Sequence, residues 1–288
     1  MAKGAKIFST AVGKKVAMAL TGLGLCIYLV LHLAGNLLLL TGSTQFNAYA
    51  HTLTAIPILP LIELGLLAIF LIHIYEAIKV SLENRNARPV GYQTKVWART
   101  KSQKSVKSVS STTMMWSGII ILVFVALHVW HFKYGKFYAV QPANVAVGTA
   151  NTGVATSSTN PQEAQEQVRD LAYLVISEFK KPLIVALYVA SMIVLGMHLF
   201  HAFSSAFQSL GVSNPRYRSI LLRTGQIFTI VIAGGFAFLP VWVYLMFPTP
   251  PPRNIAGPDN GMAVVPLTHP RLTHTRLSQS HVLRGGHQ

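Results

Sequence analysis

Cysteine and acidic residues are scarce in this 288-residue chain. A single cysteine, Cys26, excludes an intrachain disulfide and any zinc site or cluster built on cysteines. Only eight Asp and Glu residues stand against 24 Lys and Arg, and charged residues make up 11% of the chain. Because soluble domains carry about 25% charged residues, this composition excludes a soluble globular enzyme, and it also excludes a disordered protein or a disulfide scaffold.

The chain is instead rich in apolar residues, which make up 51% of it, and its formal net charge is +16. In a soluble protein such a basic excess would point to nucleic acid. With this apolar content a membrane surface is the better partner for the basic residues, and we expect no nucleic-acid partner.

Five apolar runs are long enough to cross about 30 Å of hydrocarbon, which takes about 20 helical residues. We interpret each as a helix, because an open strand cannot satisfy its backbone hydrogen bonds in lipid. The first run is too long for a cleaved signal peptide. The sequence therefore predicts an all-α membrane protein, a five-helix transmembrane domain over residues 1–247 followed by an irregular tail over 248–288. The runs cover residues 16–40, 56–78, 112–132, 182–207 and 224–247.

Lysine and arginine are distributed unevenly between the two sides of this bundle. Fifteen of them flank the runs on one side, including eight in segment 79–111, whereas the short loop 41–55 has none. The positive-inside rule then predicts a cytoplasmic N-terminus and an outer tail. The basic loops either bind anionic lipid alone or also dock a soluble partner. On the outer side we expect a flexible loop over 141–160 and an amphipathic surface helix over 161–180.

Histidines in the apolar runs need an explanation, because ionisable groups are costly in a bilayer. Four of them each stand 16 residues beyond the first or second residue of their run, about 24 Å along a helix. Since the runs alternate in direction, His32 and His128 are predicted near the outer face and His73 and His198 near the cytoplasmic face. The two levels would be roughly 15–20 Å apart in a core of about 30 Å.

Two neutral imidazoles that face each other across a bundle are the ligands that six-coordinate haem iron requires, whereas zinc requires four ligands. A single intramembrane histidine is more often a packing residue, but four at matched depth favour haem. His131 and His201 each follow one of these histidines by three residues, on the same helix face. We expect them to hydrogen-bond a haem propionate or a quinone.

Three segments also resemble a known family: KKVAMALTGLGLCIYLVLHLAGNLLLLTG followed by FNAYAHTL, HVWHFKYGKF, and GMHLFHAFSSAFQSLG. They are similar to the single-subunit di-haem cytochrome b anchor of succinate:quinone oxidoreductases, the cytochrome b-558 type of succinate dehydrogenase or fumarate reductase. The resemblance covers residues 10–245. It implies two haems b, the outer held by His32 and His128 and the inner by His73 and His198. Gly196 stands where some members have an acid implicated in proton transfer.

The resemblance further implies a subunit of respiratory complex II in a bacterial cytoplasmic membrane. A flavoprotein that holds the succinate site and an iron–sulfur subunit would dock on the cytoplasmic face, and electrons would pass through both haems to a quinone, usually menaquinone. It leaves open the direction of turnover, the haem potentials and a higher oligomer of the complex. Two other functions also stay open: a haem b anchor of a hydrogenase or formate dehydrogenase, and a proton-coupled transporter that uses the histidines with Glu63.

Reduction of a quinone consumes two protons, so its site needs polar, titratable groups near one haem and near water. Glu76 has a simpler explanation as well, a headgroup-level pair with Lys79 one turn away. The candidates on the outer side are Asn36, Asn47, His51, Glu63 and His131, and those on the inner side are Glu76, Lys79 and His201.

Overall fold

The computed structural model describes residues 10–86, 113–138, 169–212 and 214–253. All of them belong to one compact unit, Met1–Ile255. The predicted loop over 141–160, most of the basic segment 79–111 and most of the predicted tail lie outside the described residues.

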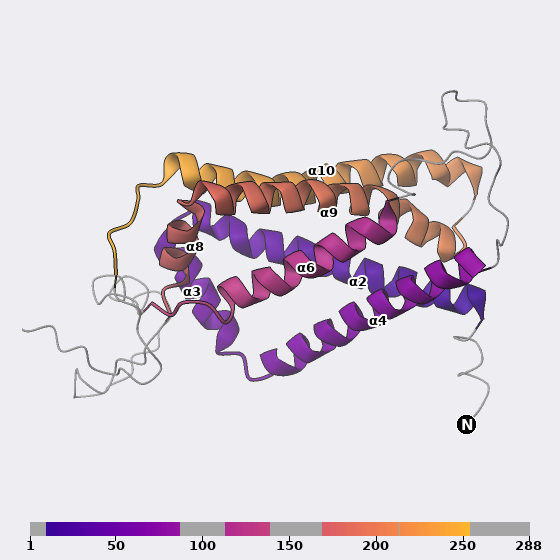
Figure 1. Ribbon diagram of the computed structural model, residues 1–288, viewed down its shortest axis with the longest axis horizontal. Coiled ribbons are helices and arrows are strands. Elements are labelled where there is room, and N and C mark those ends of the chain that lie inside the picture. The colour runs from indigo at the N-terminus through magenta and orange to yellow at the C-terminus, as the bar shows by residue number, and fades with distance from the viewer. Residues whose placement is uncertain (1–9, 87–112, 139–168, 213, 254–288) are drawn as a thin grey trace, which may run out of the picture. The chain divides into compact units, whose positions relative to one another are not determined.

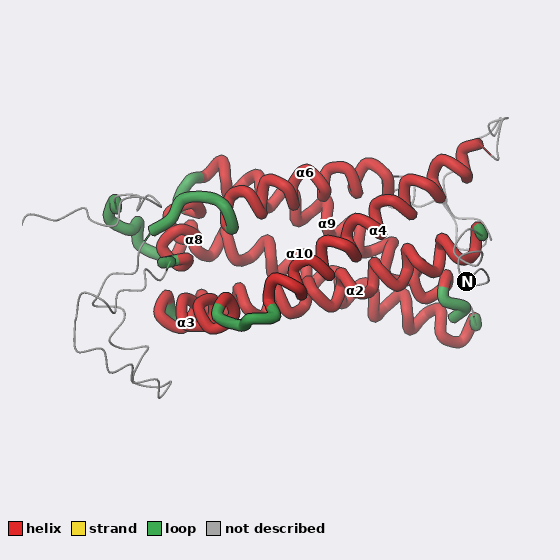
Figure 2. Tube along the Cα trace, turned by 90° about the horizontal axis from the view of Figure 1, so that it is seen from below, coloured by secondary structure: helices red, strands yellow, loops and turns green. Residues whose placement is uncertain are grey.

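The described residues form helices and loops and contain no strand (Figure 2). Five helices are long and apolar enough to cross a membrane, which confirms the predicted all-α membrane fold. Many of their large apolar side chains are exposed, as expected of surfaces that face lipid. The five are α2 (Ala11–Leu37, continued by the 3-10 turn η1, Leu38–Leu40), α4 (Leu59–Asn86), α6 (Met114–Phe132), α9 (Pro182–Ser209) and α10 (Pro215–Met246).

Two shorter helices, α3 (Ser43–Thr54) and α8 (Leu171–Phe179), lie together at one end of the bundle, which we call the α8 end (Figure 1). Helices α2, α6 and α10 run towards this end, and α4 and α9 run away from it. Helix α9 packs against α10, α2 and α6, while α2 also packs against α4. At the opposite end an ion pair between Lys14 and Glu83 joins α2 to α4.

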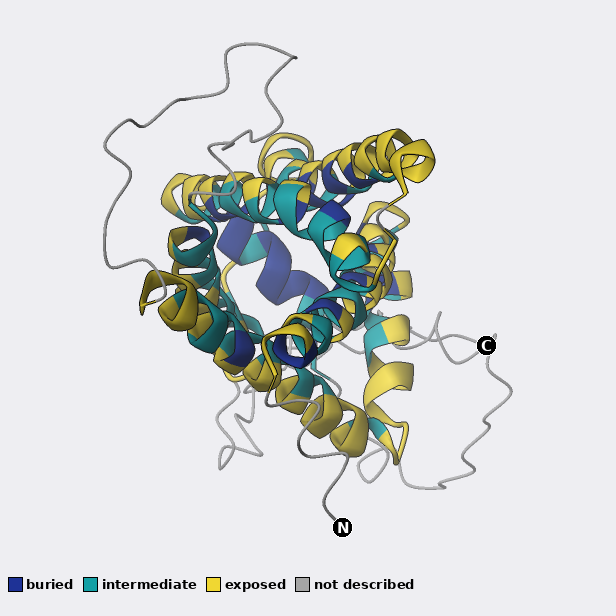
Figure 3. Ribbon diagram, turned by 90° about the vertical axis from the view of Figure 1, so that its right-hand side faces the viewer, coloured by how far each residue is buried: buried dark blue, intermediate teal, exposed yellow. Residues whose placement is uncertain are grey.

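Small residues let the central helices approach closely. A Cβ atom on Gly235 of α10 would lie 2.8 Å from Leu33 Cδ2 of α2, and one on Gly196 of α9 would lie 3.3 Å from Ala233 Cβ of α10. Figure 3 shows the buried residues on the inward faces of the helices and the exposed ones outside. Gly196 therefore serves helix packing. Some members of the family that the sequence resembles have an acid at this position.

At the end opposite α8, helices α4 and α10 extend furthest beyond the apolar runs. Helix α4 continues to Asn86, and α10 begins at Pro215, nine residues before the predicted start. Pro215 occupies the first turn of α10, and the Asn214 side chain accepts a hydrogen bond from the Arg216 amide. Hydropathy detects only the part of a helix that faces lipid, whereas backbone hydrogen bonding continues through its charged turns.

The α8 end differs from the prediction in two places. Segment 41–55, expected as a loop, contains the helix α3. Of the surface helix expected over 161–180, residues 169–180 are described, and there α8 lies within the α8 end of the bundle, because seven of its nine residues are buried. Its sequence, LAYLVISEF, is apolar on nearly every side, and α3, α6, α9 and α10 surround it. Beyond α10, residues 248–253 are non-helical, as predicted for the start of the tail.

Candidate functional site: two histidine pairs

Four helices each contribute one of the histidines that the sequence singled out. At the α8 end, His32 of α2 and His128 of α6 have ring centres 5.8 Å apart and ring planes at 85° to each other. Further from that end, His73 of α4 lies within electrostatic reach of His198 of α9. The structure thus groups the histidines in the two pairs expected from the sequence, and their role as ligands stays a prediction.

The contacts of the second pair show how far apart the two levels are. His73 contacts α2 at Thr21, and His198 contacts α6 at Ser117. On both helices the histidine of the other pair stands eleven residues further along. At a rise of about 1.5 Å per residue, the pairs are separated by about 16 Å along the helices.

The ring of His73 is held on its Nδ1 side. This atom lies 3.2 Å from the Met18 carbonyl oxygen and 3.3 Å from Thr21 Oγ1. A carbonyl oxygen only accepts hydrogen bonds, so Nδ1 carries the proton. The Nε2 atom of the neutral ring is then left with a free lone pair, the form in which imidazole binds a metal ion.

His198 is held in the same manner. Its Nδ1 lies 3.0 Å from the hydroxyl oxygen of Ser117, which is 3% exposed. That hydroxyl donates its proton to the Met114 carbonyl oxygen at 3.0 Å, so its oxygen accepts from Nδ1. These contacts match an Nδ1–H tautomer of His198, in which Nε2 carries the lone pair.

The pair at the α8 end is held mainly by rings. His32 stacks on Tyr28 with ring centres 5.3 Å apart, and its main-chain oxygen accepts a hydrogen bond of 2.7 Å from Asn36. His128 stacks on Phe124, and its Nδ1 lies 3.4 Å from the Tyr188 hydroxyl. Aromatic side chains of α2, α6 and α9 therefore surround this pair.

A buried polar cluster adjoins this pair. His131 Nδ1 lies 3.3 Å from the Tyr188 hydroxyl, and His131 Nε2 lies 3.1 Å from Glu178 Oε2. Lys181 Nζ donates to both Glu178 oxygens at 2.7 Å. Burial raises the pKa of Glu178, but the hydrogen bonds and charges of Lys181 and His131 outweigh it and hold that pKa below its usual value. The cluster therefore links the level of His128 to Lys181, whose side chain is 52% exposed.

Sequence reasoning missed Tyr188 and Glu178 in this cluster. The spacing of Glu178 and Lys181 was the one available signal, since residues three apart on a helical turn can pair. Tyr188 meets two histidines of another helix, and no local pattern reports such a contact.

The other candidates at this end have different surroundings. Asn47 is used to hold α8, because its Nδ2 donates to Asp170 Oδ1 at 2.8 Å and its Oδ1 accepts from the Ala172 amide at 2.9 Å. His51 is exposed on α3. Glu63 forms an ion pair with Lys133 in which both side chains are nearly half exposed.

Three candidates lie towards the opposite end. Glu76 is buried, and its Oε2 has no hydrogen-bond partner among the described residues. Lys79 instead donates to the Tyr75 hydroxyl at 3.1 Å, so the pair considered for Glu76 and Lys79 is not formed in the described part of the chain. His201 lies within electrostatic reach of His198.

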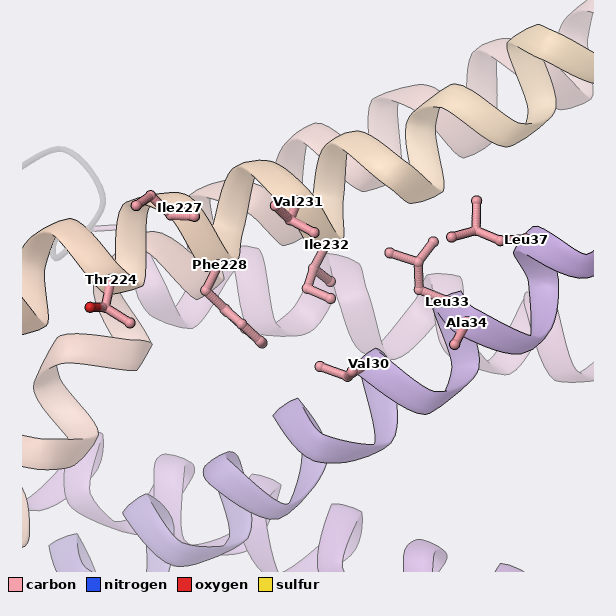
Figure 4. A pocket seen from close by; sticks show the side chains of 9 residues that line it. All are labelled: Val30, Leu33, Ala34, Leu37, Thr224, Ile227, Phe228, Val231 and Ile232. Atoms are coloured by element: carbon pink, nitrogen blue, oxygen red, sulfur yellow. The ribbon is translucent and has the colours of Figure 1, made fainter.

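A groove between α2 and α10 is lined almost wholly by apolar side chains, among them Leu33, Ala34, Phe228 and Ile232 (Figure 4). Its only polar lining residue is Thr224. The groove offers contact to hydrocarbon and no chemistry of its own.

Within the described ranges, no group of three or more His, Cys, Asp or Glu side chains is arranged to hold a metal ion. Each histidine pair could offer two imidazole nitrogens, so a metal bound there would need its other ligands from a bound group. Comparison with protein-family models, with curated proteins and with solved structures finds no match to this chain.

Proposed function

We propose that this chain is the membrane anchor and electron-transfer subunit of a succinate:quinone oxidoreductase, the respiratory complex II. In this proposal it holds two haems b and passes electrons between an iron–sulfur subunit and a membrane quinone. The supporting observation is the grouping of four histidines from four helices into two pairs, about 16 Å apart along the helices.

The residues present fit haem b, which would be held by His32 and His128 at the α8 end and by His73 and His198 at the other level. Imidazole nitrogens bind metal ions at about 2.0–2.1 Å, so two rings that share one metal ion must be near neighbours. The ring centres of His32 and His128 are 5.8 Å apart. His73 and His198 have their Nδ1 atoms hydrogen-bonded and their Nε2 atoms free, which is the usual state of a metal-binding histidine.

A haem b with two histidine ligands carries one electron and has no open position for oxygen chemistry. The chain's own residues orient the ligands and exclude water. Thr21 and Ser117 hold the rings of one pair, while Tyr28, Phe124 and Tyr188 surround the other.

We assign the quinone to the α8 end. Reduction of a quinone consumes protons, and the buried cluster at this end supplies titratable groups that can deliver them. His131 can give a proton to a bound quinone and regain one through Glu178, which contacts the half-exposed Lys181. Menaquinone is the quinone that the family resemblance suggests. Of the candidates from the sequence, His131 has the position that best suits this task.

The iron–sulfur and flavoprotein subunits would dock at the opposite end. The exposed residues Arg216 and Arg218 at the start of α10 lie there, next to the predicted cytoplasmic segments. A basic face suits an acidic protein surface as well as anionic lipid.

The test is purification of the native complex, with reduced-minus-oxidised spectra and identification of its subunits by mass. We expect about two haems b per chain together with a flavoprotein and an iron–sulfur protein. His32→Ala and His128→Ala should lose the same haem, and His73→Ala and His198→Ala the other. His51→Ala, an exposed histidine, is the control and should keep both.

Other outcomes would replace the proposal. A colourless protein with normal folding would favour the proton-coupled transporter. Two haems with hydrogenase or formate dehydrogenase subunits would identify an anchor of another enzyme. Variants of one pair that remove different haems would refute the ligand pairs.

A further inference from the structure

We infer that Thr21 and Ser117 are positioning residues for one haem, that of His73 and His198, and that they belong to a unit that occurs twice in the bundle. One unit is α2 with α4, and the other is α6 with α9. This inference rests on the proposed function, since it concerns how the ligands of one haem are oriented.

The residues that make these contacts have the same spacing on α2 and on α6. On α2, Thr21 and Gly22 stand together and His32 follows Thr21 by eleven residues. On α6, Ser117 and Gly118 stand together and His128 follows Ser117 by the same eleven. Both helices thus carry a hydroxyl, a glycine and, three turns later, a histidine of the other level.

In each unit the hydroxyl and the glycine both face one histidine ring. That histidine belongs to the next long helix in the chain. The Nδ1 atom of His73 lies 3.3 Å from Thr21 Oγ1, and that of His198 lies 3.0 Å from Ser117 Oγ. A Cβ atom on Gly22 would lie 3.1 Å from His73 Cε1, and one on Gly118 would lie 3.7 Å from His198 Cε1. A Cβ on Gly22 would crowd its ring, whereas one on Gly118 would be in ordinary contact, and each hydroxyl lies against the Nδ1 edge of the ring.

The direction of these hydrogen bonds follows from the partners of each hydroxyl. Thr21 donates to the Ala17 carbonyl oxygen at 2.8 Å, and Ser117 donates to that of Met114 at 3.0 Å. Their oxygen atoms can therefore accept from the Nδ1–H groups of the histidine rings. His73 Nδ1 also faces the Met18 carbonyl oxygen at 3.2 Å, so Thr21 shares this task, whereas His198 Nδ1 faces Ser117 at 3.0 Å. An acceptor on Nδ1–H makes the ligand more basic and strengthens its bond to the metal.

The pair at the α8 end is held differently. His128 Nδ1 meets a tyrosine hydroxyl at the longer distance of 3.4 Å, while His32 stacks on Tyr28 and has its Nε2 atom 3.5 Å from Asn36 Nδ2. Loss of the two aliphatic hydroxyls should therefore affect one haem and spare the other.

The experiment uses Thr21→Val and Ser117→Ala in the purified complex, with a redox titration that follows each haem. A weaker acceptor makes the ligand less basic and favours the reduced iron. We expect both variants to raise the midpoint potential of the same haem, the one lost in His73→Ala. Ser117→Ala should lower its retention by about 10- to 100-fold, and Thr21→Val should act in the same direction but less, because the Met18 carbonyl oxygen still accepts from His73. Thr21→Ser and Ser117→Thr keep the hydroxyl and should restore both properties.

Thr229→Val and Ser191→Ala are matched controls. Both are buried hydroxyls within the bundle: Ser191 donates to the Leu187 carbonyl oxygen at 2.8 Å, and Thr229 Oγ1 has no hydrogen-bond partner among the described residues. They should leave both potentials unchanged.

The outcomes separate this inference from the proposed function. Two haems with unchanged potentials in Thr21→Val and Ser117→Ala, or shifts in different haems, would overturn the inference and leave the proposed function standing. A wild-type protein without haem would overturn the proposed function. In that case nitrogen NMR of histidine-labelled protein reports the contacts of the rings. The Nδ1–H signal of His73 should change in Thr21→Val, and that of His198 in Ser117→Ala. Unchanged signals would overturn the positioning role as well.

Discussion

At the scale of single residues, Glu178 is the clearest case of a charge kept inside the protein by its neighbours. Its side chain is 6% exposed and contacts Lys181 and His131, with Lys136 Nζ 3.8 Å away. These three partners belong to the start of α9, to α6 and to the segment after α6. The carboxylate therefore joins elements that are distant in the sequence.

Glu178→Gln removes this charge but keeps the shape of the side chain. We expect it to lower the free energy of unfolding at neutral pH by about 1–2 kcal/mol, a value reduced because Lys181 is half exposed. The pKa of Glu178 lies below its usual value, so its contribution is present above about pH 4.3 and is lost as the pH falls through the lowered pKa. Thermal unfolding in detergent across this pH range measures it.

Glu63→Gln is the control for this prediction. Glu63 pairs with Lys133, but their side chains are 45% and 44% exposed. An exposed pair contributes little, so we expect a change of less than about 1 kcal/mol. Equal effects of the two variants, or a difference at Glu178 that persists at acid pH, would contradict the role given to the buried pair.

At the scale of elements, α8 depends on contacts from outside itself. An isolated helix of nine residues is unstable in water, so tertiary packing must hold it. Asp170 caps its N-terminus, where Oδ1 accepts from the Tyr173 amide at 2.9 Å and from Asn47 Nδ2 at 2.8 Å. Its other oxygen accepts from Arg253 at 2.7 Å. One side chain thus connects α8 to α3 and to the segment that follows α10.

Asp170→Ala should destabilise the α8 end. Loss of a helix cap costs about 1 kcal/mol, and the Asn47 and Arg253 groups left without their partner add to it, for a total of about 2–4 kcal/mol. Thermal unfolding gives the total effect, and limited proteolysis should show earlier cleavage near α8.

Asn214→Ala is the matched control, because Asn214 is exposed and its side chain also caps a helix, by accepting from the Arg216 amide. We expect a cost of about 1 kcal/mol or less. If both variants cost the same, the additional bonds of Asp170 contribute nothing measurable.

At the scale of the whole molecule, the alternating direction of five long helices places α3 and α8 at one end and the exposed residues Arg85 and Arg216 at the other. The positive-inside rule predicts the basic end in the cytoplasm. Cys26, the only cysteine, is buried, so a cysteine introduced at an exposed position reports its own side of the membrane.

Thr52→Cys on α3 and Asn84→Cys on α4 are both at exposed positions. A membrane-impermeant maleimide should label Thr52→Cys in intact cells and Asn84→Cys only after the membrane is permeabilised. The unsubstituted chain should stay unlabelled. Labelling of the two variants from the same side, or in the reverse order, would contradict the predicted orientation.

The positions of the histidines show why sequence reasoning reached so far in this protein. Depth along an apolar run is a local quantity, and alternating direction turns it into a level in the membrane. His32 and His128 were thereby grouped without any knowledge of packing. The same reasoning could not find Tyr188, because a contact between helices leaves no periodic signal in either of them.

The sequence by itself determined the five long helices, because lipid requires every apolar run to satisfy its own backbone hydrogen bonds. It also predicted which histidines share a level. Only the tertiary structure decided the tautomers of His73 and His198, the ionised state of Glu178 and the burial of α8. These features depend on side chains that come from different helices, and close approach in space, not order along the chain, sets their chemistry.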